Sequence, residues 1–439
     1  MKRIPFNLRL RRFLRLPLVS PRLWARRMVF WVGAGLVAAV AVGFARAADA
    51  AGVLFARMLA ISPFLPLIVA PPGFAVALWL TRRVFPGAQG SGIPQVIAAL
   101  RLEDRAAIQQ VLSLRIAAGK IGLTLLGLAC GASIGREGPT VQVGAAIMNA
   151  LGRSLRLPRP ELERALILGG GAAGIAAAFN TPLAGVVFAI EELGRSFEAR
   201  TGRTVLTCVV LAGIATLALA GNYTYFGATS ATLDLGRGWV AVLICGVTGG
   251  VSGGLFSSVL VRASRGVPGA AGRFVFQQPM AFAALCGLGI ALLGLVSGGQ
   301  TYGTGYAQAR LLVEGRDDLG AAYPLLKFLA SLISYLSGVP GGIFAPSLSV
   351  GAGLGSWLAH LLPEAPAGAV VLLSMVAYFS GVVQAPLTAT VIVMEMADNG
   401  PMTVPLMATA MLAWSVSRIV CRYPLYEALA ERFLAAARR

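Results

Sequence analysis

The sequence predicts an all-α polytopic membrane protein built from tilted and broken helices. Hydrophobic residues make up 57% of the 439-residue chain and charged residues only 13%, whereas soluble domains carry about 25% charged residues. The 54 glycines agree with this class, because membrane helices pack closely through small residues. Several apolar stretches are shorter than the roughly 20 residues that a spanning helix needs, which favours broken and partly re-entrant helices. The stretches lie near residues 29–48, 59–80, 111–134, 141–151, 166–190, 204–221, 238–262, 281–297, 320–337, 343–362, 368–394 and 401–421.

The formal net charge of +19 is concentrated at the two ends of the chain, next to apolar segments. This distribution argues against nucleic-acid binding and, by the positive-inside rule, predicts cytoplasmic ends that suit anionic lipid headgroups. We therefore expect a multi-pass protein of the cell (inner) membrane. Its parts are a basic cytoplasmic segment at 1–28, a membrane transport domain at 29–423 and a short cytoplasmic tail at 424–439.

The reactive side chains do not form a pattern typical of catalysis or metal binding. The five cysteines are scattered singly in apolar segments, and the lone His360 has no partner motif such as HExxH. We expect no metal, no cofactor and no enzymatic activity, although a membrane-embedded hydrolase is an alternative class of protein.

A charged pentapeptide, Gly135-Arg136-Glu137-Gly138-Pro139, interrupts two strongly apolar runs. An ionisable residue at such a place marks a transport or relay function by default. A helix that begins at Pro139 would direct unpaired N–H groups and its positive dipole end toward the loop, which attracts an anion. The alternative is a charged interhelical turn in which Arg136 and Glu137 pair with each other.

Two halves of the chain resemble each other. The segment 139–145 recurs at 346–352, and Pro182 with Glu191 recurs as Pro386 with Glu395. The two offsets are 207 and 204 residues, so we expect one repeat at about 29–221 and another at about 238–423. Internal repeats of this kind are typical of transporters whose binding site lies between the halves.

Two more glycine–proline loops accompany the charged pentapeptide. One is Gly338–Pro346, and the other is Gly90–Pro94, in which Ser91 is a candidate helix N-cap. Three helix starts at such loops would supply three sets of N–H donors that coordinate a small anion by backbone dipoles alone. The alternative is that these are ordinary membrane turns.

A few acidic residues adjoin apolar runs without loop-like surroundings: Glu137, the pair Glu191–Glu192, and Glu395. Separated carboxylates of this kind are the fewest groups that could move protons through an apolar core. Neighbouring residues on a helix point about 100° apart, so Glu191 and Glu192 cannot share one role. We expect Glu192 to relay protons to Glu137, and Glu191 to serve packing or an interfacial ion pair; the alternative is that both only cap a helix end.

Together these motifs resemble the CLC family of chloride channels and chloride/proton antiporters, in its bacterial form. GSGIP at 90–94, GREGP at 135–139, GGIFAP at 341–346 and a tyrosine near the C-terminal end, Tyr426, occur in the order typical of the family. The resemblance implies two inverted-topology repeats and a homodimer in which each subunit has its own anion path.

The resemblance also implies roles for individual residues. The hydroxyls of Ser91 and Tyr426 and the backbone N–H groups of Ile343 and Phe344 would contact the anion. Glu137 would be the external gating glutamate, and Glu192 the internal proton-transfer glutamate. A basic residue preceding GREGP has a weaker counterpart in Lys120.

The sequence also departs from the family pattern. Gln95 stands where familiar bacterial members have an acidic residue, and the nucleotide-binding CBS pair of many eukaryotic members is absent. Ser91, in place of the proline of nitrate-preferring members, favours chloride. The sequence therefore predicts a chloride/proton antiporter. The alternative on the same fold is a passive voltage- or proton-gated chloride channel, which the acidic Glu192 disfavours.

Overall fold

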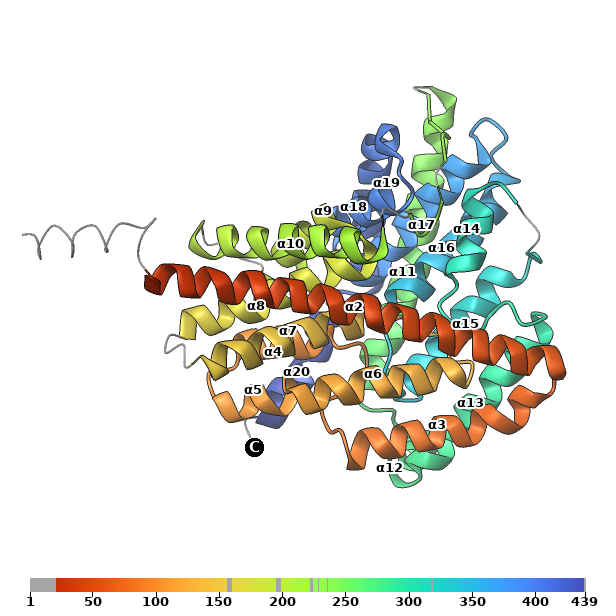
Figure 1. Ribbon diagram of the computed structural model, residues 1–439. Helices are drawn as coiled ribbons and strands as arrows, with labels where there is room; N and C mark the ends of the chain where they lie inside the picture. The colour runs from red at the N-terminus through yellow and green to blue at the C-terminus, as the bar shows by residue number, and fades with distance from the viewer. Residues whose placement is uncertain are drawn as a thin grey trace, which may run out of the picture.

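The computed structural model describes residues 21–155, 160–194, 199–221, 224–227, 229–234, 236–316 and 319–437. These residues form helices joined by short loops (Figure 1), and the β-structure among them is a single antiparallel bridge between Gly135 and Gly342. The predicted all-α polytopic class is therefore confirmed.

The helices fall into two series separated by a connection near residue 230. The first series comprises α2 (Pro21–Ile61), α3 (Leu65–Arg83), α4 (Ile93–Arg101), α5 (Arg105–Val111), α6 (Leu114–Ala129), α7 (Glu137–Ser154), α8 (Pro160–Phe179), α9 (Pro182–Phe188), the π-helical turn η1 (Ala189–Gly194) and α10 (Ala199–Ala220). The second comprises the 3₁₀ turn η2 (Arg237–Trp239), α11 (Val240–Arg265), α12 (Gly269–Gln277), α13 (Pro279–Val296), α14 (Tyr306–Val313), α15 (Tyr323–Leu336), α16 (Phe344–Ala359), α17 (Ala367–Val383), α18 (Pro386–Met396), the 3₁₀ turn η3 (Gly400–Met402), α19 (Thr403–Val420) and α20 (Leu425–Ala437).

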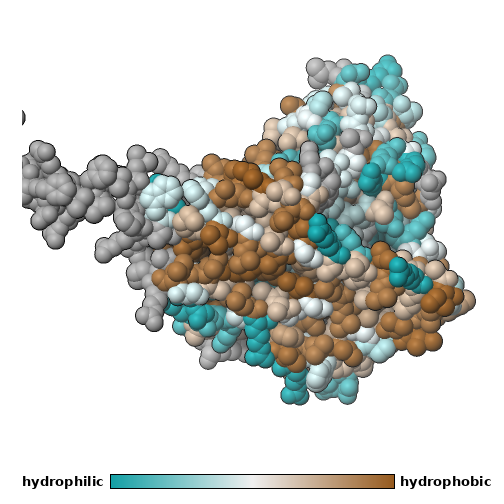
Figure 2. Space-filling view, in the orientation of Figure 1, coloured by the Kyte–Doolittle hydropathy of each residue, from teal (hydrophilic) through white to brown (hydrophobic). Residues whose placement is uncertain are grey.

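The described residues form both long apolar helices and short helices. Among the described residues, seven stretches are long and apolar enough to cross a membrane, the longest being Arg27–Ile61 within α2. By contrast, α9 has 7 residues and α18 has 11, well short of the roughly 20 that a spanning helix needs. Figure 2 shows a broad band of hydrophobic side chains along α2 and its neighbours, bordered by hydrophilic ones. The predicted mixture of spanning and broken helices is confirmed.

The packing of the first series recurs in the second. Helix α7 packs on α8 as α16 packs on α17, and α2 packs on α10 as α11 packs on α19. Counterparts also meet across the centre, since α3 packs on α13 and α9 on α18. The two bridged residues, Gly135 and Gly342, are themselves 207 positions apart. An antiparallel bridge between equivalent residues is a local two-fold arrangement, so the halves face each other at this point.

Two helix starts differ from the sequence-based prediction. Helix α7 begins at Glu137, so Pro139 is its third residue and not its first. Helix α4 begins at Ile93, and its N-cap is Gly92, whose φ of 108° suits glycine alone. The prediction that Ser91 caps this helix is therefore wrong, and its hydroxyl is left for another partner.

The two expected end segments are partly helical where the structure describes them. Residues 1–20 of the basic segment 1–28 lie outside the described residues, and residues 21–28 already belong to α2. Most of the expected tail 424–439 is helix α20, which packs on α4 and fully buries Leu425 and Tyr426. Its apolar residues recur at helical spacing, so it docks on the membrane domain and is not a free tail.

Candidate functional site

The three glycine–proline loops meet at one place, held together by their own backbones. Gly135 and Gly342 each donate an N–H to the carbonyl of the other, at 2.7 Å, and Gly341 donates to the Gly90 carbonyl at 3.1 Å. The loops that lie far apart in the sequence therefore form one hydrogen-bonded junction between the two halves.

The junction depends on glycine because the backbones approach too closely for side chains. A Cβ on Gly138 would collide with the Ser91 hydroxyl, and one on Gly342 would lie 3.1 Å from the Gly138 nitrogen. Glycine lacks this atom, which allows such close approach. The glycines of the motifs therefore bring the three loops together.

Three helices begin at this junction: α4 at Ile93, α7 at Glu137 and α16 at Phe344. The first N–H groups of a helix have no partner within the helix, and its N-terminus carries partial positive charge. None of these three starts has a side-chain cap. The arrangement therefore presents several backbone donors to an anion without a fully charged cation.

Ser91 and Tyr426 bring two hydroxyls to the junction. Both residues are fully buried. Neither hydroxyl has a partner among the described residues at a distance and angle suitable for a hydrogen bond. They are neighbours, and the charges that act on the Tyr426 hydroxyl include the carboxylates of Glu192 and Glu137. A buried hydroxyl without a partner is costly, which favours a ligand that accepts hydrogen bonds from both.

The ring of Phe344 covers the apolar side of the junction. It lies 5.9 Å from the Tyr426 ring and 4.7 Å from the Phe379 ring, between centroids. Phe344 and the adjacent Ile343 are 1% and 2% exposed. Apolar rings around backbone donors keep water away and strengthen the electrostatic attraction of the donors for an anion.

Glu137 is fully buried as the first residue of α7. The Tyr306 hydroxyl donates to its Oε1 at 2.5 Å, while its Oε2 lies against Gly135 and has no partner among the described residues. Gly135 and Ala345 flank the same point. The carboxylate thus lies between the first turns of α7 and α16.

Arg136 is held by partners other than Glu137. Its guanidinium donates to the Asp49 carboxylate at 2.7 Å, to the Ala45 carbonyl at 2.6 Å and to the Tyr225 hydroxyl at 2.9 Å. The alternative prediction, a turn closed by an Arg136–Glu137 pair, is therefore wrong. Asp49, on the long helix α2, was not expected from the sequence to contact the pentapeptide.

The two neighbouring glutamates of the first half have different surroundings. Glu192 lies on η1 and is 5% exposed, on the side of Tyr426. Glu191 accepts the backbone N–H groups of Leu387 and Thr388, at 3.1 and 2.6 Å, at the start of α18. Of the two roles expected for Glu191, packing or an interfacial ion pair, the ion pair is wrong: the carboxylate caps a helix of the other half and so helps to pack the two halves together.

Lys120 and Gln95 brace the loop that carries Ser91. The fully buried Lys120 donates to the carbonyls of Gly90 and Gln89, at 2.8 and 3.3 Å. Gln95 donates its amide to the carbonyls of Gly87 and Gln89. A neutral amide donor thus binds loop carbonyls at this position.

Lys327 and Tyr306 were missed in the sequence. Lys327 is also fully buried and donates to the carbonyls of Thr301 and Gly303, at 2.9 and 2.8 Å. It lies 207 positions after Lys120, so the repeat offset could have revealed it. Tyr306 has no comparable signal, because its contact with Glu137 joins residues 169 positions apart.

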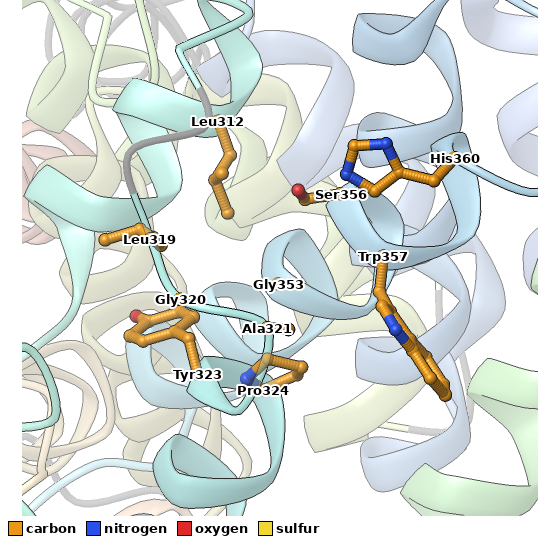
Figure 3. A pocket seen from close by; sticks show the side chains of 10 residues that line it. All are labelled: Leu312, Leu319, Gly320, Ala321, Tyr323, Pro324, Gly353, Ser356, Trp357 and His360. Atoms are coloured by element: carbon orange, nitrogen blue, oxygen red, sulfur yellow. The ribbon is translucent and has the colours of Figure 1, made fainter. Parts of the chain in front are cut away.

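A separate cavity of about 110 Å³ lies between α14, α15 and α16 (Figure 3). His360, Ser356, Trp357 and Tyr323 are among its lining residues, and none of the expected site residues takes part. Among the residues that the structure describes, no group of three or more His, Cys, Asp or Glu side chains is arranged to hold a metal ion.

Gly131–Gly135 also matches the G-x-S-x-G pattern of hydrolases. Its Ser133 hydroxyl, however, shares a hydrogen bond with the Ser331 hydroxyl at 3.1 Å. A second hydroxyl is no general base, so this serine does not form the nucleophile–base pair that a hydrolase needs.

Known proteins resemble this chain over most of its length. A family model described as "Voltage gated chloride channel" matches residues 73–418. The H(+)/Cl(-) exchange transporter ClcA of Yersinia pestis bv. Antiqua (strain Angola) is 32% identical over 378 residues, covering 81% of this chain and 75% of that protein. The protein of the same name from Yersinia pseudotuberculosis serotype O:3 (strain YPIII) has the same identity and coverage.

Solved structures are similar as well. A slow cyanobacterial Cl⁻/H⁺ antiporter matches with a TM-score of 0.79 and 27% identity, over 94% of this chain and 99% of its own. A CLC-type fluoride/proton antiporter also matches with a TM-score of 0.79, at 23% identity, over 92% of this chain and 98% of its own. The second likeness concerns the fold alone.

Proposed function

The chain belongs to the voltage-gated chloride channel family, and we propose that it is an antiporter that exchanges chloride for protons. One observation carries this proposal: the buried carboxylate of Glu137 lies between the first turns of two helices, at the junction that also holds two unsatisfied hydroxyls. Relatives named as H(+)/Cl(-) exchange transporters and Cl⁻/H⁺ antiporters support it.

In this proposal the anion binds at the junction of the three loops. Ser91 and Tyr426 donate their hydroxyls, and Ile343 and Phe344 contribute backbone N–H groups at the start of α16. These donors are neutral, so the site attracts chloride without holding it permanently. Transport needs such a balance, because an ion that binds too strongly cannot leave.

Glu137 couples this site to protons. When ionised, its carboxylate competes with chloride for the positive ends of α7 and α16. When protonated, it loses the charge that held it there, and chloride can take its place. Glu192, on the side of Tyr426, exchanges the proton with the cytoplasm, so that Glu137 is the external and Glu192 the internal acid.

A passive chloride channel on the same fold is the second candidate function. It requires the anion path and the gate but no internal proton acceptor. The buried position of Glu192 near Tyr426 favours exchange, because a carboxylate in such a place is costly unless it has a function.

We extend the proposal to the topology. The two repeats, at about 29–221 and 238–423, form one multi-pass domain in the inner membrane, with both termini in the cytoplasm. The basic charge of segment 1–28 would favour association with anionic lipid headgroups.

A homodimer completes the proposal. The short helices α9 and α18 start at the surface, where Glu191 and Glu395 cap them beside the exposed Leu183 and Leu387. Polar helix ends that face lipid are unfavourable. A second copy packed over α9, α18, α10 and α19 would cover them, and each subunit keeps its own anion path.

Reconstitution into liposomes tests the proposed function. Vesicles loaded with chloride and diluted into low chloride should release chloride and take up protons against a pH gradient, recorded together with a chloride electrode and a pH electrode. Glu137→Gln should release chloride without moving protons, because the neutral amide cannot cycle between charged states. Chloride release by the unmodified protein without proton uptake would favour the channel.

A further inference from the structure

We propose that Tyr306 is a positioning residue for Glu137, the gating glutamate. Its hydroxyl holds the Glu137 carboxylate at the starts of α7 and α16 and so weakens chloride binding. We call this contact between Tyr306 and Glu137 the latch. The inference rests on the proposed function in one respect, that Glu137 competes with the anion. It adds a group from α14 that none of the three glycine–proline motifs contains.

The contact is a hydrogen bond between two protein groups in a largely closed space. The Tyr306 hydroxyl donates to Glu137 Oε1 at 2.5 Å, and Glu137 is fully buried. Hydrogen bonds to an ionised acceptor are shorter and roughly twice as strong as neutral ones. The hydroxyl therefore stabilises the ionised carboxylate in this place, and does so less for the protonated acid.

An aromatic and cationic cluster fixes the Tyr306 ring. The ring stacks on Tyr225 with centroids 4.9 Å apart and an interplanar angle of 27°. The Arg136 guanidinium lies 5.6 Å from the Tyr225 ring centre and 6.0 Å from that of Tyr306, and Asp49 holds Arg136. Arg136 and Asp49 are thus the charged groups around the latch, and the ring keeps its place without its hydroxyl.

The loop before Tyr306 is anchored from two sides. Lys327 of α15 donates to the carbonyls of Thr301 and Gly303. Ser349 of α16 donates to the carbonyl of Gly305 at 3.0 Å, and Gly305, with a φ of 84°, is the N-cap of α14. The first residue of α14 is therefore held firmly relative to α16, whose start adjoins the Glu137 carboxylate.

This anchoring gives the two buried lysines parallel roles. Lys120 braces the loop that carries Ser91, and Lys327, its counterpart in the second half, braces the loop that ends at Tyr306. One lysine positions a donor for the anion, and the other positions a donor for the carboxylate that competes with it.

Tyr306→Phe tests the latch, because it removes the hydroxyl and keeps the stacked ring. We expect chloride, titrated into the purified full-length protein by calorimetry, to bind about five- to tenfold more tightly, since one charge-assisted hydrogen bond no longer holds the competing carboxylate. Tyr302→Phe is the matched control: that hydroxyl donates to the Ala291 carbonyl, and its loss should leave the affinity unchanged.

The same change is then made in Glu137→Ala, which has no carboxylate. There, Tyr306→Phe should have no effect on chloride affinity if the hydroxyl acts through Glu137. An equal tightening in both backgrounds, an equal tightening by Tyr302→Phe, or no tightening by Tyr306→Phe would each overturn the latch.

The calorimetric result is independent of proton transport. If the unmodified protein moves chloride without protons in liposomes, the proposed antiport fails while the latch still stands or falls by the binding data. If Tyr306→Phe does not fold, Tyr306→Leu also removes the hydroxyl and brings no other hydrogen-bond donor, and the same tightening is expected.

Discussion

At the scale of single residues, the hydroxyls of Ser91 and Tyr426 are the polar side chains that the proposed anion site offers. Both are buried and lack a protein partner among the described residues. When the anion leaves, a buried hydroxyl remains without a net charge. A buried arginine or lysine would instead remain as an unpaired charge, which has a much larger desolvation penalty. Neutral donors therefore suit a site that must bind and release in every cycle.

The first prediction concerns these two donors. Ser91→Ala and Tyr426→Phe should each weaken chloride binding by about five- to thirtyfold, since one hydrogen bond to an ionised group contributes on the order of 1–2 kcal/mol. Calorimetric titration of the purified protein with chloride measures the effect. Ser415→Ala, on an exposed part of α19, is the control. Unchanged affinity in both site variants would remove the hydroxyls from the anion site.

The second prediction concerns Glu192. Glu192→Gln keeps the size of the side chain but cannot carry a proton, so it should conduct chloride down its gradient with no accompanying proton movement. Chloride and pH electrodes on the same liposome suspension measure both fluxes. Proton uptake that equals that of the unmodified protein would show that Glu192 is a helix cap and not a relay.

At the scale of helices, each half supplies a glutamate that caps the start of a short helix in the other half. Glu191 accepts the N–H groups that open α18, and Glu395 accepts those of Leu183 and Ala184 that open α9, at 3.2 and 2.7 Å. Each carboxylate thus satisfies donors that a short helix leaves unpaired. The exchange joins the two repeats at a second place, apart from the glycine bridge.

The third prediction follows from these reciprocal caps. Glu191→Gln and Glu395→Gln should each destabilise the protein by about 1 kcal/mol, because an amide offers one acceptor oxygen in place of two. Both variants should keep proton-coupled chloride transport. Thermal unfolding in detergent measures the first effect, and liposome fluxes measure the second. Loss of coupling in Glu191→Gln would assign that residue a place in the proton path.

At the scale of the whole molecule, one part of the surface faces lipid in the proposed dimer, and another part contacts the second subunit. Helix α3 packs on α13 with one side and exposes apolar residues such as Val76 on another, which suits lipid. The group α9, α10, α18 and α19 also exposes apolar side chains, such as Met407, but includes the capped ends of the two short helices. A second copy excludes lipid from those polar ends.

The fourth prediction compares these two surfaces. Met407→Trp should shift the purified protein from dimer to monomer, because a large ring disrupts a packed interface. Val76→Trp should leave the dimer unchanged, because lipid accommodates the ring. Light scattering of the protein–detergent complex gives the mass. The monomer should still exchange chloride for protons, since each subunit has its own path. An unmodified protein of monomer mass would contradict the proposed dimer.

Local patterns in the sequence were enough to predict the membrane class, the repeat offset and the three loops. Composition determines whether a chain is stable in a membrane. The glycines and prolines at 90–94, 135–139 and 341–346 determine the loops through their own backbone geometry. The same offset also contained the Lys120–Lys327 pair, which a longer search for repeats would have found.

Only the tertiary structure decided which side chains meet at the junction. Tyr306 contacts Glu137 across 169 positions and Arg136 contacts Asp49 across 87, so no local period relates them. The docking of α20, which buries Tyr426, and the start of α7 at Glu137 depend on hydrogen bonds and packing between distant segments. Residues near one another in the chain determine helices and loops, whereas the contacts that tune a site arise when distant helices pack.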